Sequence, residues 1–159
     1  MDKLENEFAE FIQQVFKNLG LDSLSSRIVA FLYIEPTEIS IERLSRKTGY
    51  SLSSISTKAK FLENVNIIEK IKKPGSKKVY YFMEKDIFKI LDSKVDKVME
   101  GEVAPAKENI PKIIEKYQGK KLTEKSKKTL NIIKNYHKQI LAMEKLMLDF
   151  KKKLRGIKK

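Results

Sequence analysis

The segment GYSLSSISTKAKFLENVNIIEK, from Gly49 to Lys70, decides the fold of this chain. Four apolar residues recur at steps of four, three and three, the spacing of one face of an α-helix: Ile55, Ala59, Leu62 and Val65. The opposite face carries short or polar side chains: Ser53, Thr57, Lys60 and Asn64. Ser51 precedes the pattern as an N-cap residue. The segment therefore predicts a helix that begins after Ser51 and exposes a face rich in hydroxyls.

Three helices are expected before this segment. The first follows apolar residues at steps of three and four: Leu4, Phe8, Phe11, Ile12, Val15, Phe16 and Leu19. The second is predicted over residues 23–34, and Pro36 ends it. Ser40 is the expected N-cap of a short third helix, which Thr48 and Gly49 close.

The pattern changes from helical to β after Asn66. Two runs rich in β-branched and aromatic residues, 67–73 and 77–83, flank the turn sequence Pro74-Gly75-Ser76. They predict a hairpin directly behind the helix. The order helix, turn, helix, hairpin predicts a mainly α fold, an α+β winged helix-turn-helix over residues 23–83 with a two-stranded wing.

A connecting region, 84–122, is expected to follow the hairpin. It opens with a helix from Glu84, but the stretch GEVAPAKENIP, 101–111, holds one glycine and two prolines. These residues predict a linker with little structure, followed by a short helix over 112–118.

The last segment, 123–159, is predicted to form one long helix that Thr123 caps. Its apolar residues alternate at steps of three and four: Ile133, Tyr136, Ile140, Met143, Met147, Phe150 and Leu154. This spacing is typical of a coiled-coil seam.

The exposed hydroxyls and lysines behind Gly49 predict a nucleic-acid contact. A helix that enters the major groove needs short donors and acceptors in its N-terminal half, because bulky side chains would hold it away from the base edges. Lysines beside them would neutralise phosphates. The side chains that fit these needs are Ser53, Ser54, Thr57, Lys58 and Lys60. The alternative is that the serines only cap and solvate a surface helix.

The predicted hairpin turn is basic, with Lys72 and Lys73 before Pro74-Gly75 and Lys77 and Lys78 after them. A basic wing can lie along a phosphate ridge or enter the minor groove. We expect Lys73, Lys77 and Lys78 to contact DNA there. The alternative is a solvated turn whose lysines protect a sheet edge from unwanted pairing.

Composition narrows the functional class. The 159 residues carry a net charge of +13, which points to a polyanion, although a lysine-rich proteome would give the same bias. With no cysteine and one histidine, His137, the chain offers no converging catalytic set and no cluster of metal ligands. We therefore expect no enzyme, no metal and no other cofactor. An acidic start and short apolar runs predict a cytoplasmic protein without a membrane span.

Beyond these patterns, the sequence resembles winged helix-turn-helix regulators of the MarR superfamily. It is most similar to the branch named for the glycine-betaine synthesis repressor, in its archaeal form. Four stretches carry the resemblance: FKNLGL (16–21), Arg27-Ile28, ISIERLSRKTGYSLSSIST (39–57) and PGSKKVYY (74–81). The similarity covers residues 8–83.

The resemblance implies a homodimeric transcriptional regulator, such as a repressor, that binds a palindromic operator in double-stranded DNA. Such relatives commonly respond to small molecules, so an unidentified effector is a further expected partner. The positions that fall on the start of the recognition helix are Ser51, Ser53, Ser54, Ser56, Thr57 and Lys58. Lys77 and Lys78 fall where the family usually has Arg and Lys in the wing. Ser76 replaces an acid that can brace that arginine in relatives, and Phe61 occupies a position that is usually polar.

Dimerisation is expected at both ends of the chain, through the N-terminal helix, 1–22, and the C-terminal helix. The predicted contacts are Phe8, Phe11, Ile12, Val15, Ile133, Tyr136, Ile140, Met143, Met147 and Phe150. For each helix the alternative is packing within its own chain. The alternative function is a winged-helix protein-interaction module in a larger complex, which would not need a basic, serine-rich face.

Overall fold

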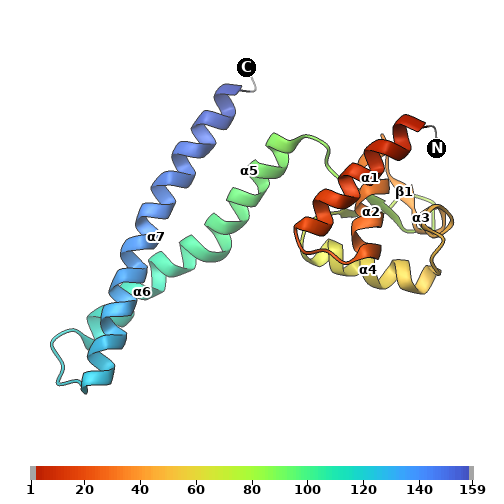
Figure 1. Cartoon of the computed structure of the whole chain (residues 1–159). Coiled ribbons are helices and arrows are strands. Elements are labelled where there is room, and N and C mark those ends of the chain that lie inside the picture. Colours follow the sequence, from red (N-terminus) through yellow and green to blue (C-terminus); the bar gives the residue numbers. More distant parts are fainter. Residues whose placement is uncertain (1–2, 158–159) are drawn as a thin grey trace. The chain divides into compact units, whose positions relative to one another are not determined.

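The computed structural model describes residues 3–157, and the chain divides into two compact units, 1–85 and 86–159 (Figure 1). The first two residues of the predicted N-terminal segment and the last two of the predicted C-terminal helix lie outside the described range. We call the two parts the winged unit and the helical unit. Each is described by itself.

The winged unit is a helix-turn-helix with a small antiparallel sheet. Its elements are α1 (Lys3–Asn18), α2 (Ser23–Ile34), β1 (Ile39–Ser40), α3 (Ile41–Thr48), α4 (Leu52–Asn64), β2 (Glu69–Ile71) and β3 (Tyr80–Phe82). The strand order is β1-β3-β2, with Tyr81 of β3 between Ile39 of β1 and Lys70 of β2. This arrangement confirms the predicted winged helix-turn-helix and adds the strand β1.

The core of the winged unit forms where the apolar faces of α2, α3 and α4 meet the sheet. The large side chains Ile28, Leu32, Leu44, Ile55 and Leu62 are among those that are completely buried in it. Burial of the predicted inward face of α4 fixes the rotation of that helix, so its hydroxyl-rich face points to solvent. Truncation of such a buried leucine to alanine costs about 2–5 kcal/mol of stability.

Local capping sets the ends of the helices as expected. The Ser40 Oγ accepts a hydrogen bond of 3.3 Å from the Arg43 backbone N–H, and the Ser51 Oγ accepts one of 3.2 Å from Ser54. Gly49 ends α3 in the left-handed region, at φ +77°. A glycine adopts this φ without the steric cost that a Cβ brings, and the tight turn between α3 and α4 depends on it.

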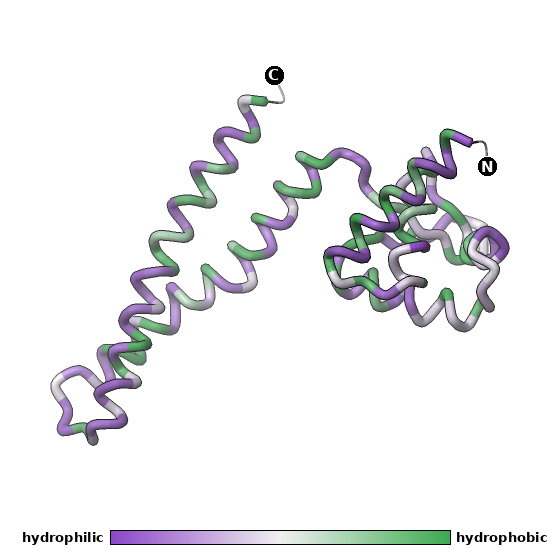
Figure 2. Tube along the Cα trace, viewed as in Figure 1, coloured by the Kyte–Doolittle hydropathy of each residue, from purple (hydrophilic) through white to green (hydrophobic). Residues whose placement is uncertain are grey.

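The helical unit consists of α5 (Ile87–Val98), a π-helical turn (Met99–Val103), α6 (Ala104–Tyr117) and α7 (Glu124–Ile157). The helix α7 runs back alongside α5 and α6, and all three alternate apolar and polar residues along their length (Figures 1 and 2). The core is small, with Val103, Ala106 and Ile140 buried together. No helix within residues 3–157 is both long and apolar enough to cross a bilayer.

The expected linker at 101–111 is wrong, because these residues are helical. Pro105 stands at the start of α6, directly after the π turn, and has no N–H to donate to the preceding turn. The N–H of Ala104 reaches back five residues to the Met99 carbonyl, so the backbone widens into a π turn just ahead of this proline. Packing of Val103 and Ala106 against α7 outweighs the local turn signals. The predicted short helix, 112–118, is the end of α6.

Candidate nucleic-acid interface

The solvent-facing side of α4 presents a row of small polar groups. Ser53, Ser56, Thr57 and Lys60 are all exposed, at helical steps of three, one and three. The opposite side of the same helix is fixed in the core by Ile55, Ala59 and Leu62, as described above. The row therefore faces outward on a helix that cannot rotate without exposing its core residues. Four of the seven predicted positions on α4 and its cap share this face.

Two other predicted serines have a structural task. The Ser51 and Ser54 hydroxyls lie 2.9 Å apart, and the Ser51 Oγ also accepts from the Ser54 N–H. These contacts are the N-cap of α4, which matches the capping alternative for these two residues. The cap still leaves them at the helix N-terminus, where free backbone N–H groups favour phosphate.

Lys58 does not share the outward row, because it pairs with a residue of the winged unit itself. Its Nζ donates a hydrogen bond of 3.0 Å to Asp22, the N-cap of α2. Burial alone would raise the pKa of Asp22, but hydrogen bonds from the Ser25 side chain and backbone, together with Lys58, lower it to about 2. A phosphate that contacts Lys58 must therefore compete with a carboxylate that stays ionised.

All four lysines of the wing turn are exposed. Three of them form no ion pair within residues 3–157, although the charge of Lys78 acts on the Glu42 carboxylate of α3: Lys72, Lys77 and Lys78. Gly75 takes φ +74° at the tip. Ser76, which replaces the family acid, accepts a hydrogen bond of 3.1 Å from the Lys78 N–H. Its short side chain therefore orders the turn locally instead of bracing a basic side chain.

Lys73 points back onto the winged unit. It forms an ion pair with Glu38, just before β1, and its ammonium lies 4.6 Å from the centre of the Tyr80 ring. The hydrogen bond to Glu38 raises the pKa of Lys73 and lowers the pKa of Glu38. Lys73 thus ties the start of the wing turn to the α2–β1 connection, a role that its place in the sequence did not indicate.

A buried carboxylate holds the helix-turn-helix together. Glu35, at the end of α2, is 9% exposed and accepts a hydrogen bond of 3.1 Å from the Arg43 guanidinium. Lys47 forms a second ion pair with the same carboxylate. Both cations belong to α3, so Glu35 anchors α3 to the end of α2. The contacts span 8 and 12 residues, beyond the reach of any local motif.

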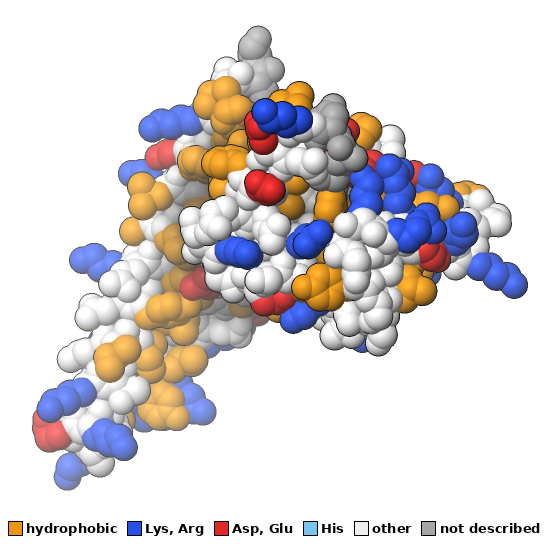
Figure 3. All heavy atoms as spheres, turned by 45° about the vertical axis from the view of Figure 1, so that its right-hand side comes forward, with side chains coloured by type: hydrophobic (Ala, Val, Ile, Leu, Met, Phe, Trp, Pro, Cys, Tyr) orange, Lys and Arg blue, Asp and Glu red, His pale blue; other side chains and the backbone are white. Residues whose placement is uncertain are grey.

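The positive charge of the winged unit is concentrated around α4 and the wing. Residues 49–83 contain seven lysines and two acidic residues, whereas the whole of 1–85 carries 14 basic and 11 acidic residues. Lys and Arg side chains gather on one side of this unit in the space-filling view (Figure 3). The net charge of +13 for the chain therefore does not describe this surface, whose positive charge comes from the lysines of residues 49–83.

The predicted dimer contacts of α1 divide between core and surface. Ile12 is 7% exposed and packs on Ala30 of α2, so the structure corrects the prediction for Ile12: its apolar side chain is used within its own chain. Val15 is half-buried. Phe8 and Phe11 are exposed, with ring centres 6.3 Å apart.

The predicted seam of α7 likewise packs within the chain. Ile140 is 2% exposed against α6 and the π turn, which corrects its assignment as a dimer contact, and Met143 packs on the same cluster. Ile133 and Met147 are half-buried, whereas Tyr136 and Phe150 are exposed. The most exposed large apolar side chains of α7 are instead Ile132 and Leu146, at 68% and 70%. Sequence spacing showed an apolar stripe here but not which of its edges remains uncovered.

Comparison with known proteins adds relatives to this geometry. No family model matches the chain. It is 26% identical over 88 residues to the Bacillus subtilis protein YvaV, named as a candidate HTH-type transcriptional regulator, with 55% of this chain and 50% of that protein covered. It is 25% identical over 91 residues to the HTH-type transcriptional repressor OpcR of the same organism, covering 55% and 49%. The chain thus spans about half the length of both curated relatives.

A solved structure described as a transcriptional regulator superposes with a TM-score of 0.61. The superposition covers 91% of this chain and 93% of the other at 18% identity, so it extends over both units. At that identity the likeness speaks for the fold alone. The chain is therefore a winged helix-turn-helix protein with a helical unit, similar in part of its sequence to HTH-type transcriptional regulators.

Proposed function

We propose that the protein is a sequence-specific DNA-binding transcriptional regulator. The observation that carries the proposal is the outward face of α4, where Ser53, Ser56, Thr57 and Lys60 stand exposed above a buried apolar face. A helix held in this way offers short hydrogen-bonding groups to base edges and a cation to phosphate. The names of YvaV and OpcR support the same function, and that of OpcR favours repression.

In this proposal the N-terminal half of α4 enters the major groove. The hydroxyls of Ser53, Ser56 and Thr57 reach base edges or phosphates, and Lys60 neutralises the backbone. Lys77 and Lys78, at the tip of the wing, contact the flanking backbone or the minor groove. The cap of α4 places its free N–H groups towards a phosphate.

We further propose that two copies bind a palindromic operator. One winged helix reads only a single half-site, and two-fold symmetry doubles the contacts at a fixed spacing of about one helical turn. The exposed apolar side chains available for a partner are Phe8 and Phe11 of α1 and Ile132, Leu146 and Phe150 of α7. Phe8, Phe11 and Phe150 keep their predicted place in the proposed interface, whereas Ile132 and Leu146 take the place of Ile12 and Ile140.

The helical unit offers cavities in which a small-molecule effector could bind, and one of them has largely apolar walls. A cavity of about 310 Å³ lies between the end of α6 and the start of α7. Its walls are largely apolar, with Tyr117 and Leu122 among them, and Lys125 supplies a cation. We propose this cavity as the first position to test for an effector.

The deciding experiment compares affinity for the DNA upstream of the protein's own gene with affinity for random duplex DNA of equal length, by fluorescence anisotropy. We expect tighter binding to the native upstream DNA than to random DNA. Replacement of Lys60 by alanine should weaken the binding free energy by about 1 kcal/mol or more. Lys94→Ala in α5 is the matched control, because Lys94 is also an exposed helical lysine. No preference for any native DNA, with Lys60→Ala equal to Lys94→Ala, would favour the protein-interaction module instead.

A further inference from the structure

The positive charge of this protein lies mostly outside the winged unit. Residues 86–159 carry 20 basic and 10 acidic residues, a net charge of +10 out of +13. Within them, residues 116–159 hold 15 basic residues and only three acidic ones. DNA recognition by α4 and the wing does not account for this excess.

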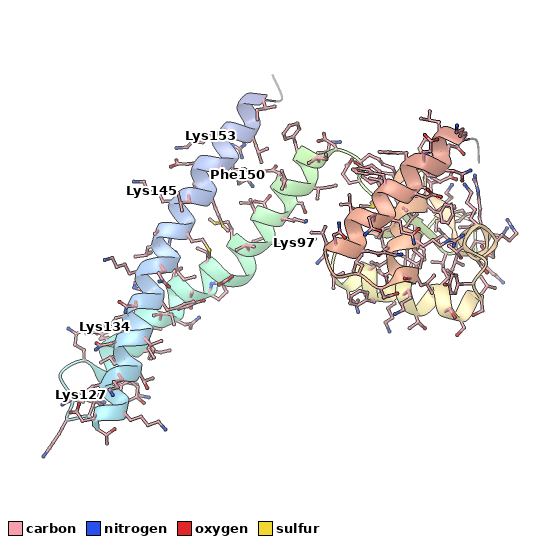
Figure 4. The ribbon with its side chains drawn as sticks, viewed as in Figure 1. Lys97, Lys127, Lys134, Lys145, Phe150 and Lys153 are labelled. Atoms are coloured by element: carbon pink, nitrogen blue, oxygen red, sulfur yellow. The ribbon has the colours of Figure 1, made fainter. Side chains whose placement is uncertain are left out.

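The excess is ordered along one face of α7. Five exposed lysines follow one another at steps of seven, four, seven and seven residues, so they share one side of the helix: Lys127, Lys134, Lys138, Lys145 and Lys152. We call this set the lysine row. At 1.5 Å per residue it extends over about 37 Å. Figure 4 shows Lys134 and Lys145 on the side of α7 that points away from α5.

The middle of the lysine row is unpaired within the described residues. At its ends, Lys127 lies 2.7 Å from Glu124 and Lys152 lies 4.0 Å from Asp149. Lys134, Lys138 and Lys145 form no ion pair with any residue from 3 to 157. By contrast, Lys151 on another side of α7 pairs with both Asp92 and Asp96 of α5. Like charges four residues apart, as at Lys134 and Lys138, disfavour the helix slightly, so the charges in the middle of the row do not stabilise α7.

The position of the row favours nucleic acid over a lipid surface. A helix that lies on a membrane needs its apolar face at the same interface as its cations. Here the packed apolar face of α7, with Ile140 and Met143, lies against the π turn and α6 of the same unit, opposite the lysine row. The exposed apolar side chains beside the row are Leu141 and Leu148, too few for a continuous apolar face. A straight line of cations about 37 Å long instead matches one turn of B-DNA, about 34–36 Å.

We propose that the lysine row is a second nucleic-acid contact, which binds the phosphate backbone of duplex DNA without reading its sequence. The identity of the polyanion rests on the proposed function, since the duplex is taken to be DNA of the kind that α4 binds. The row adds affinity and salt dependence, whereas sequence preference stays with α4 and the wing.

The test is the triple variant Lys134→Gln, Lys138→Gln and Lys145→Gln in the full chain. Its matched control removes the same charge at three other exposed positions of the helical unit, Lys94→Gln, Lys97→Gln and Lys121→Gln. Affinity for random duplex DNA is measured from about 50 to 200 mM salt, where each lost phosphate contact lowers the slope of log K against log salt by about 0.9. Far-UV circular dichroism establishes that both variants retain their helices.

We expect the row variant to lose up to about 2.7 of the slope while it keeps any preference for native over random DNA. The control should keep the slope of the unaltered protein. An unchanged slope in the row variant, or an equal loss in the control, overturns the second contact. If the unaltered protein and the control bind phosphatidylserine vesicles but the row variant does not, and the salt slope of the row variant for DNA is unchanged, the row is reassigned to a lipid surface.

The two proposals fail in different ways. Binding without any sequence preference, with a slope that falls in the row variant, overturns specific recognition by α4 but leaves the lysine row as a DNA contact. Sequence preference with an unaffected slope in the row variant overturns the lysine row as a DNA contact but leaves specific recognition by α4. Failure of the unaltered protein to bind any duplex at about 50 mM salt overturns both.

Discussion

Lys58 of α4 donates a hydrogen bond of 3.0 Å to Asp22, the residue that caps α2. One carboxylate thus serves two purposes: it satisfies the N–H groups of Leu24 and Ser25 at the start of α2 and holds a lysine of the proposed recognition helix. Contact between Lys58 and a phosphate would have to break or share this pair.

Release of Lys58 should therefore tighten DNA binding. Asp22→Asn keeps an N-cap of similar quality and removes the charge that holds Lys58. We expect a several-fold gain in affinity for duplex DNA at low salt, measured by anisotropy. The gain should vanish in a Lys58→Ala background, because Asp22→Asn then has no lysine to release; the four proteins form a double-mutant cycle. A gain that persists in the Lys58→Ala background would show that Asp22 acts on DNA through its own charge.

The same carboxylate should give the winged unit an acid-sensitive component of stability. The pKa of Asp22 is lowered from 3.8 to about 2 on folding, so its contribution is complete above about pH 4 and disappears as the pH falls towards 2. Because the pair with Lys58 is partly exposed, we expect the charge to contribute less than about 1 kcal/mol. Urea unfolding of the unaltered protein and Asp22→Asn should differ at about pH 6 and converge near pH 2. A difference independent of pH would contradict the assignment.

Glu35 should be the most costly acidic residue to replace in the winged unit. Glu35→Gln leaves Arg43 and Lys47 facing a neutral amide in a nearly buried position. We expect a loss of about 1.5–3 kcal/mol in the free energy of unfolding, the range for hydrogen bonds to charged groups. Glu69→Gln, at an exposed position of β2, is the control and should lie within about 0.5 kcal/mol of the unaltered protein. Equal effects of the two changes would remove the anchor from α3.

Two leucine-sized residues of α7 should separate folding from dimerisation. Leu146 is 70% exposed, whereas Ile140 is 2% exposed in the helical unit. Leu146→Asp should shift the protein towards monomer in sedimentation velocity while its helix content stays unchanged. Ile140→Ala should instead destabilise the helical unit by about 2–5 kcal/mol, the cost of truncation in a core. A dimer of unaltered stability in Leu146→Asp would remove this edge of α7 from the interface.

Release of Lys73 from Glu38 should make the wing turn more mobile and free this lysine for a phosphate. Glu38→Gln removes the charged partner of Lys73. The hydrogen bond to Glu38 raises the pKa of Lys73. We expect the salt slope of DNA binding to steepen by up to about 0.9, the contribution of one additional phosphate contact. Glu69→Gln again provides the control. A slope equal to that of the control would mean that Lys73 stays on Tyr80 after its acid is removed.

Sequence periodicity was sufficient to predict α4 and the core beneath it. Ile55, Ala59 and Leu62 lie at helical spacing, and burial of that face determines which hydroxyls are exposed. The caps at Ser40 and Ser51 were predictable because each hydrogen bond joins residues less than four positions apart in the sequence. Interactions of this local kind leave a signal in a short window of sequence.

Contacts between distant residues left no such signal. Lys58 and Asp22 are 36 positions apart, and nothing near either residue indicates the other. The strand β1 has two residues, too few for an alternating pattern. At 101–111 a local signal was present but outweighed, because the packing of Val103 and Ala106 on α7 decides the backbone there. The uncovered edges of α7 depend in the same way on which neighbours pack beside it.

The π turn at Met99–Val103 has a consequence for insertions and deletions. Such a turn spans five residues where α-helical bonding spans four, so the helical unit already contains one residue beyond a regular repeat. Loss of any one residue there would restore α geometry, and because four α-helical residues close the turn that five close now, α5 would keep its rotation relative to α6. Asp92 and Asp96 would then still face Lys151, whatever residue was lost. The same loss inside α6 would turn the preceding helix by about 100°, so the π turn is the place in this unit where the chain length can change by one residue.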